Sequence, residues 1–162
     1  MLFRSDATPV LVNAALCVLF GSTLARGREP LIARIIDVIE GAARLALPRV
    51  SAYARALTQA WTLLFGVQAV VLATLVACIE PEGVFARFGA APPLHVGDGG
   101  RWYLHFGSYA LVGAFMLAEY AFRRWHLREI PHAPLPVFLA QLARRWPALV
   151  RRFADDAAGA PR

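Results

Sequence analysis

Polar side chains inside long apolar segments are the residues of this chain best placed to do chemistry. Asn13, Gln68 and Glu119 each lie within such a segment. Because burying an amide or a carboxylate in an apolar medium is costly, such groups pair with one another or line a path for a ligand or a proton. For Asn13 and Gln68 we expect hydrogen bonds between helices. Glu119 stands four residues before Arg123, which predicts an ion pair along one helix, with a proton- or ligand-binding group as the alternative.

Motifs of known catalytic chemistry are missing from the sequence. No phosphate-binding loop, dinucleotide fingerprint, nucleophile elbow or zinc-hydrolase helix occurs. Cys17 and Cys78 lie in apolar runs without metal-ligand spacing, which predicts small buried side chains. His126 and His132 are the histidines that a membrane-embedded transferase would use. We predict no catalytic residue, no metal site and no cofactor, and the sequence favours a protein that is not an enzyme.

Three apolar segments must position these polar residues, namely 7–25, 57–79 and 102–122. The hydrocarbon core of a bilayer is about 30 Å thick and needs about 20 apolar helical residues. The chain is 58% hydrophobic and 17% charged, whereas soluble domains average about 45–50% and about 25%. Since irregular backbone cannot satisfy its polar groups in lipid, the sequence predicts an all-α membrane protein with three transmembrane helices.

The arginines predict the orientation of these helices. All 17 basic residues are arginine, and the formal net charge is +6. The loop 26–56 holds six arginines and three acids, the loop 80–101 holds two and three, and the tail 123–162 holds eight and three. Basic flanks stay in the cytoplasm, so we expect the first loop and the C-terminus inside and the N-terminus outside. Because the arginines flank apolar segments, we expect no nucleic-acid partner.

Two amphipathic stretches are predicted on the cytoplasmic side. In the first loop, isoleucines and leucines recur at helical spacing after Pro30, which predicts an interfacial helix at about 30–46. Pro48 ends this pattern, and a groove on a partner protein is the alternative surface for the helix. The tail alternates apolar residues with arginines, which favours anionic lipid. We therefore divide the chain into a membrane domain, 1–130, and a basic amphipathic tail, 131–162.

Two motifs carry a resemblance to a known family. They are the stretch GREPLIAR at 27–34 and the pattern Tyr53-x-Arg55-x-x-Thr58-x-x-Trp61. With them, the chain resembles a family of small bacterial inner-membrane proteins. The genes of that family tend to lie among type II fatty-acid or polyketide synthase genes, including clusters for aryl polyene pigments. No residue role is established for the family, so the resemblance implies only a link to lipid or polyketide biosynthesis genes and a location in the inner membrane.

The resemblance implies a non-enzymatic accessory protein that anchors or organises a lipid- or polyene-type biosynthetic assembly. The expected partners are membrane lipids, mainly anionic ones, and an acyl carrier protein or a synthase or exporter protein, held by arginines of the cytoplasmic face. Orientation signalling is the plain alternative for each arginine. Other functions left open are a lipid or polyene exporter subunit and a membrane-embedded transferase. The candidate functional residues are Asn13, Arg28, Glu29, Arg34, Tyr53, Arg55, Thr58, Trp61, Gln68, Glu119, Arg123, Arg124 and His132.

Overall fold

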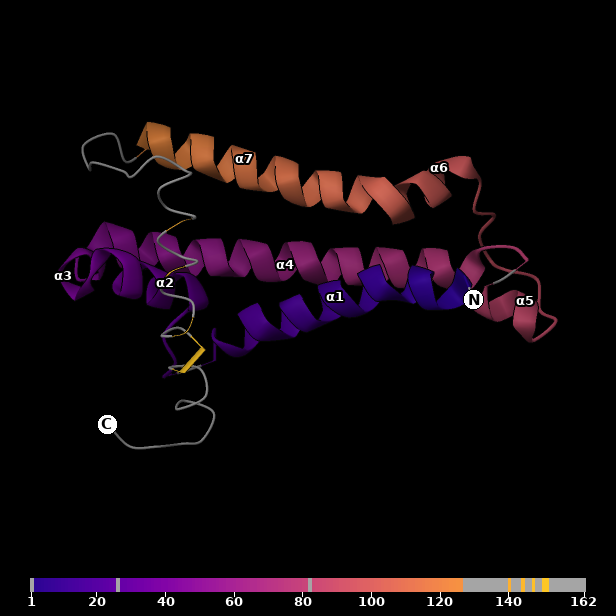
Figure 1. The fold of residues 1–162 in the computed structure, drawn as a ribbon, viewed down its shortest axis with the longest axis horizontal. Coiled ribbons are helices and arrows are strands. Elements are labelled where there is room, and N and C mark those ends of the chain that lie inside the picture. Colours follow the sequence, from indigo (N-terminus) through magenta and orange to yellow (C-terminus); the bar gives the residue numbers. More distant parts are fainter. Residues whose placement is uncertain are drawn as a thin grey trace. The chain divides into compact units, whose positions relative to one another are not determined.

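The computed structural model describes residues 2–25, 27–81 and 83–126, together with positions 140, 144, 147, 150 and 151, and this part of the chain is all-helical. The predicted all-α fold is thereby confirmed for the described residues. Of the predicted tail, only those five positions are described, so the tail stays a prediction. The elements (Figure 1) are α1 (Leu2–Ser22), α2 (Leu31–Glu40), α3 (Ala42–Leu45), α4 (Pro48–Cys78), α5 (Val84–Arg87), α6 (Asp98–Trp102), the π-helical turn η1 (Tyr103–Gly107) and α7 (Ser108–His126).

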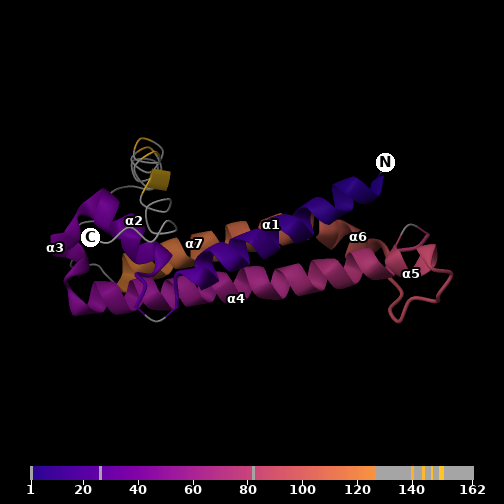
Figure 2. The ribbon, with the colours of Figure 1, turned by 90° about the horizontal axis from the view of Figure 1, so that it is seen from below.

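The chain divides into two compact units. The first contains the described residues of 1–19 and 62–130, and the second contains those of 20–61 and 131–162. In the first unit, α1 and α7 each run along the part of α4 that belongs to it (Figure 1, Figure 2). The core of this unit is a cluster of Leu72, Val76 and Leu104, with Val10 packed against it. Aliphatic side chains from three helical segments thus meet in one contact region.

The first unit exposes many large apolar side chains and buries a few polar ones. Leu63 and Val70 of α4 are 69% and 67% exposed. Gln68, on the same helix, is only 1% exposed. Other large apolar side chains of this unit are also exposed, namely Leu11, Val18, Phe106, Leu117 and Trp125. The buried residues of the unit are still mostly apolar, but a fully buried glutamine is uncommon in a protein folded in water, where amides are mostly exposed.

The second unit contains α2, α3 and the first turns of α4. The helix predicted at about 30–46 is present, but Gly41 divides it into α2 and α3. Gly41 has a φ of 92°, a left-handed conformation that glycine adopts without steric cost. Its N–H donates to the Asp37 carbonyl, 3.0 Å away. Pro48 ends the pattern as predicted, and it also begins α4, where its missing N–H costs no hydrogen bond.

The three predicted spans differ in how far the fold supports them. Among the described residues, α4 alone is long and apolar enough to cross a membrane, and Ala7–Ser22 is an apolar but shorter helix. The third segment, 102–122, extends over α6, η1 and α7, so no single α-helix contains it. The last turns of α7 also carry Glu119, Arg123 and Arg124. The number of spans therefore stays a prediction.

Candidate functional site

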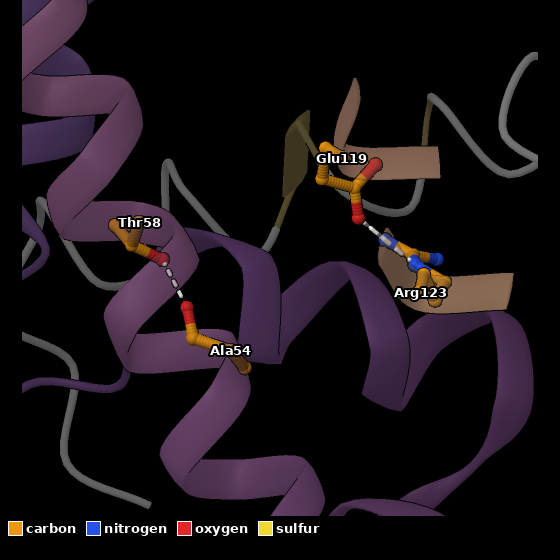
Figure 3. A network of polar contacts seen from close by, with 4 residues as sticks. All are labelled: Ala54, Thr58, Glu119 and Arg123. Atoms are coloured by element: carbon orange, nitrogen blue, oxygen red, sulfur yellow. Dashed lines mark hydrogen bonds and ion pairs between the residues drawn. The ribbon is translucent and has the colours of Figure 1, made fainter. Parts of the chain in front are cut away.

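In the second unit, two threonine hydroxyls hold the amino end of α2. The Leu31 N–H donates to Thr23 Oγ1 at 3.0 Å, and the Ile32 N–H donates to Thr58 Oγ1 at 3.3 Å. The Thr58 hydroxyl in turn donates to the Ala54 carbonyl at 2.8 Å (Figure 3). The first N–H groups of a helix have no acceptor within the helix, so these hydroxyls satisfy them. Thr58 thereby fixes the start of α2 on α4.

Arg34 has a structural position that the sequence did not indicate. Its side chain was expected on the basic cytoplasmic face, but it is buried, with 7% exposed. Its Nε donates to the backbone carbonyl of Glu29 at 3.0 Å. A buried guanidinium needs such acceptors because its charge is costly to desolvate. Arg34 therefore orders the segment before α2, and it is not available to an exposed anion-binding face.

A cavity of about 270 Å³ lies between the start of α2, α3 and the first turns of α4. Its charged lining residues are Glu29 and Arg55, and Ser51 contributes a hydroxyl. Among the described residues no hydrogen bond or ion pair engages the side chains of Glu29 and Arg55. The complete lining is Glu29, Pro30, Ala33, Leu45, Ser51, Ala52 and Arg55. The cavity thus offers one negative and one positive group to a small ligand.

The remaining candidates of the second unit have separate positions. Trp61 stacks at a tilt against Phe20, with ring centroids 6.2 Å apart and an interplanar angle of 39°. Arg28 is exposed and donates weakly to the Ser22 carbonyl at 3.5 Å. Tyr53 is half-buried. The motif from Tyr53 to Trp61 therefore combines a helix cap, a ring contact and one cavity residue.

In the first unit, Gln68 links α4 to the helix that follows η1. The Tyr103 hydroxyl donates to Gln68 Oε1 at 3.2 Å, and Gln68 Nε2 donates to the Ser108 carbonyl at 3.4 Å. The expected hydrogen bond between helices is confirmed for Gln68. For Asn13 that expectation is wrong, because its Nδ2 donates to the Pro9 carbonyl of its own helix at 2.8 Å. Since Asn13 follows Pro9 by four residues, its amide reaches that carbonyl locally.

The ion pair predicted at the end of α7 is present. Nε and Nη2 of Arg123 donate to one carboxylate oxygen of Glu119 at 2.9 and 2.7 Å (Figure 3). Both side chains are largely buried, whereas Arg124 is exposed. His132 lies outside the described residues.

Sequence reasoning missed three contributors to these two sites: Thr23, Tyr103 and Ser108. Thr23 stands eight residues before Leu31, a spacing that no local capping motif uses. Tyr103 and Ser108 are 35 and 40 residues from Gln68, so only the folded arrangement brings them together. Ser108 contributes its backbone carbonyl, which any residue offers, so its side chain gave no signal for this contact. Its buried hydroxyl has no hydrogen-bond partner among the described residues.

In the part of the chain that the structure describes, no three His, Cys, Asp or Glu side chains come together as a metal site requires. Cys17 is half-buried and Cys78 is buried, and both are free thiols. No protein-family model, curated protein or solved structure matches the chain.

Proposed function

We propose that the chain is a multi-pass inner-membrane protein that acts as a non-enzymatic accessory subunit, anchoring or organising a lipid- or polyene-type biosynthetic assembly. In this proposal α1, α4 and the helical path from Asp98 to His126 cross the bilayer. The N-terminus and the loop 80–101 are periplasmic. The loop 26–56 and the C-terminal tail are cytoplasmic, as their arginines favour.

The observation that carries the membrane location is the combination of exposed large apolar side chains and buried polar side chains in the first unit. Leu63, Val70 and Leu117 are each more than half exposed, whereas Gln68 and Ser108 are buried. In water, large contiguous apolar surfaces are rare unless a partner or a membrane covers them. In lipid, the same surface costs nothing, and buried amides contribute hydrogen bonds between helices. The bilayer is therefore the solvent in which this distribution is stable.

Helix length supports three crossings. At about 1.5 Å per residue, α4 is about 46 Å long, α1 is about 32 Å long, and the path from Asp98 to His126 is about 43 Å long. Each reaches the hydrocarbon thickness of about 30 Å when its polar ends are counted, whereas the apolar part of α1, Ala7–Ser22, is about 24 Å long. Because α4 is longer than the bilayer core, its first turns extend beyond the hydrocarbon, where Arg49 and Arg55 reach water or headgroups.

The accessory role follows from the cytoplasmic charge and from the resemblance to proteins encoded near synthase genes. Arg28, Arg55 and Arg124 are exposed, and they lie on segments that the proposed topology places in the cytoplasm. Exposed guanidinium groups bind carboxylates and phosphates through paired hydrogen bonds. An acidic acyl carrier protein offers both, which makes it the natural partner for this face.

Binding of an acyl carrier protein to the purified chain in nanodiscs tests the accessory role. We expect binding to weaken as salt rises, because exposed charge pairs are screened over about 10 Å at 0.1 M salt. It should fall in a variant that combines Arg28→Gln with Arg124→Gln. Arg87→Gln, on the proposed periplasmic side, is the matched control and should bind as the unaltered chain does. Binding that ignores both salt and the cytoplasmic substitutions would refute the role.

A further inference from the structure

The cavity of the second unit is lined by two residues of opposite charge whose side chains have no hydrogen bond or ion pair with the described part of the chain. Glu29 is half-buried and Arg55 is exposed, and both line the same space of about 270 Å³. Two such groups in one cavity ordinarily pair within 4 Å. Here the described residues show no ion pair between them. The cavity therefore has one residue that can bind a cation and one that can bind an anion among its lining.

The walls of this cavity are held in place by contacts of its neighbours. Arg34 binds the Glu29 backbone carbonyl, so the segment that carries the carboxylate is fixed. Thr58 binds the Ile32 N–H, so the start of α2 is fixed on α4 beside Arg55. The Ser51 hydroxyl donates to the Pro48 carbonyl at 3.1 Å, which leaves its oxygen lone pairs available as acceptors. The backbone segments that carry the two charges are therefore held by hydrogen bonds, which lowers the entropy cost of ordering them when a ligand binds.

A ligand that satisfies both charges carries a cation and an anion a short distance apart. The carboxylate of Glu29 and the Ser51 oxygen accept hydrogen bonds from an ammonium group, which has three N–H donors. The Arg55 guanidinium donates to a phosphate. The space far exceeds the roughly 10–15 Å³ that one water needs on this measure. The phosphoethanolamine group is the small zwitterion that combines an ammonium and a phosphate.

We propose that this cavity binds the phosphoethanolamine group of a membrane phospholipid. The lipid source rests on the proposed membrane location, because Ser51, Ala52 and Arg55 stand on α4 directly before the charge-free stretch 57–79. That position corresponds to the headgroup layer. Pro30, Ala33, Leu45 and Ala52 add apolar surface for the carbon atoms that adjoin the headgroup.

The test is lipid competition on the full chain in detergent micelles, read by native mass spectrometry. The chain is mixed with equal amounts of phosphatidylethanolamine, phosphatidylglycerol and phosphatidylcholine, which share the phosphate but differ in the cation. We expect phosphatidylethanolamine to be retained preferentially, because glycerol carries no charge and the choline nitrogen carries no N–H. Glu29→Gln should lower the preference by about tenfold, the loss typical of one charge-assisted hydrogen bond.

Arg55→Gln should lower retention of all three lipids together, since it removes the contact to the phosphate that they share. Arg49→Gln, an exposed arginine in the first turn of α4 that does not line the cavity, is the matched control and should leave retention unchanged. Far-ultraviolet circular dichroism confirms that each variant is folded. Equal retention of the three lipids by the unaltered chain, or an unchanged preference in Glu29→Gln, would overturn the proposal.

Two further experiments show whether the bound phosphoethanolamine group belongs to a lipid or to a free small molecule, and they distinguish failure of this inference from failure of the proposed function. Free O-phosphoethanolamine, titrated by calorimetry, should bind more weakly than the lipid if the acyl chains contribute, and equally tight binding would overturn the lipid assignment. A chain that sediments with membranes but shows no lipid preference would refute the cavity inference alone. A chain that remains in solution without detergent would refute the proposed location.

Discussion

Thr58→Val is the substitution that most sharply tests how the second unit is held together. Valine keeps the branched shape of threonine and removes the hydroxyl. The bond from Thr58 Oγ1 to the Ala54 carbonyl is replaceable, because that carbonyl still accepts the helical N–H four residues on. The hydrogen bond that Oγ1 accepts from the Ile32 N–H cannot be replaced in the same way, because the first N–H groups of α2 have no acceptor within the helix.

The expected loss follows from that single bond. Removing a helix cap costs about 0.5–2 kcal/mol, and leaving a donor unsatisfied costs about 1–3 kcal/mol when it is fully buried, whereas the Ile32 N–H is only partly buried. These are two measures of the same event, so we expect Thr58→Val to lower the free energy of unfolding by about 1–2 kcal/mol. Hydrogen exchange at the Ile32 amide should accelerate at the same time, since its acceptor has gone.

Thr74→Val is the matched control on the same helix. Thr74 Oγ1 donates to the Val70 carbonyl at 2.9 Å and is exposed, so its removal should change stability by no more than about 0.5 kcal/mol. Both variants are measured by reversible unfolding in mixed detergent, with exchange followed by mass spectrometry. Equal stability losses in the two variants, with unchanged exchange at Ile32, would refute the assignment of Thr58 as the cap of α2.

Three other substitutions have defined outcomes. Gln68→Leu removes two hydrogen bonds of about 0.6 kcal/mol each, so the free energy of unfolding in detergent should fall by about 1 kcal/mol. Gln59→Leu, at an exposed position of the same helix, is the control and should leave the free energy of unfolding unchanged. Gly107→Ala should destabilise, because the new Cβ would lie 2.7 and 2.8 Å from two aromatic side chains. At Gly113 an added Cβ has no neighbouring atom within 4 Å, so Gly113→Ala should stabilise the chain by about 0.5–1 kcal/mol. Equal effects of the two substitutions on stability would contradict the packing described at η1. Glu119→Gln removes the charge from a largely buried ion pair and should cost about 1–3 kcal/mol, and cells that make the variant should still deliver lipid normally. Loss of delivery with full stability would instead favour the exporter alternative.

The helices could be predicted from the sequence because their cause is local. Apolar periodicity after Pro30 indicated the amphipathic stretch, and the charge-free segment that contains Gln68 indicated the long helix. Even so, α4 begins nine residues before the predicted span, at Pro48, because a proline is favoured at a helix start and the next turns contain no breaker. The division at Gly41 was also readable as a glycine stop signal, but the sequence interpretation extended the helix through it.

The sites could be predicted only where both partners share one helix. Glu119 and Arg123 are four residues apart, so helical geometry alone brings them together. Gln68 was singled out as a buried amide, but its acceptor and donor depend on the packing of α4 against η1. Arg34 was assigned to an exposed face because arginine is usually solvated. Its burial depends on the path of the chain before α2, which periodicity does not encode.

The most direct test of the proposed membrane location is to measure whether lipid or water surrounds the exposed side chains of the first unit. A spin label is placed on one residue at a time, at Leu63, Val70 or Leu117, in a chain from which Cys17 and Cys78 have been removed by substitution. Each label reports how often it collides with oxygen, which partitions into lipid, and with a polar nickel chelate, which stays in water. In reconstituted vesicles we predict that all three labels collide more with oxygen than with the chelate. Labels that collide preferentially with the chelate at all three positions would show that these side chains face water, and the proposed membrane location would be wrong.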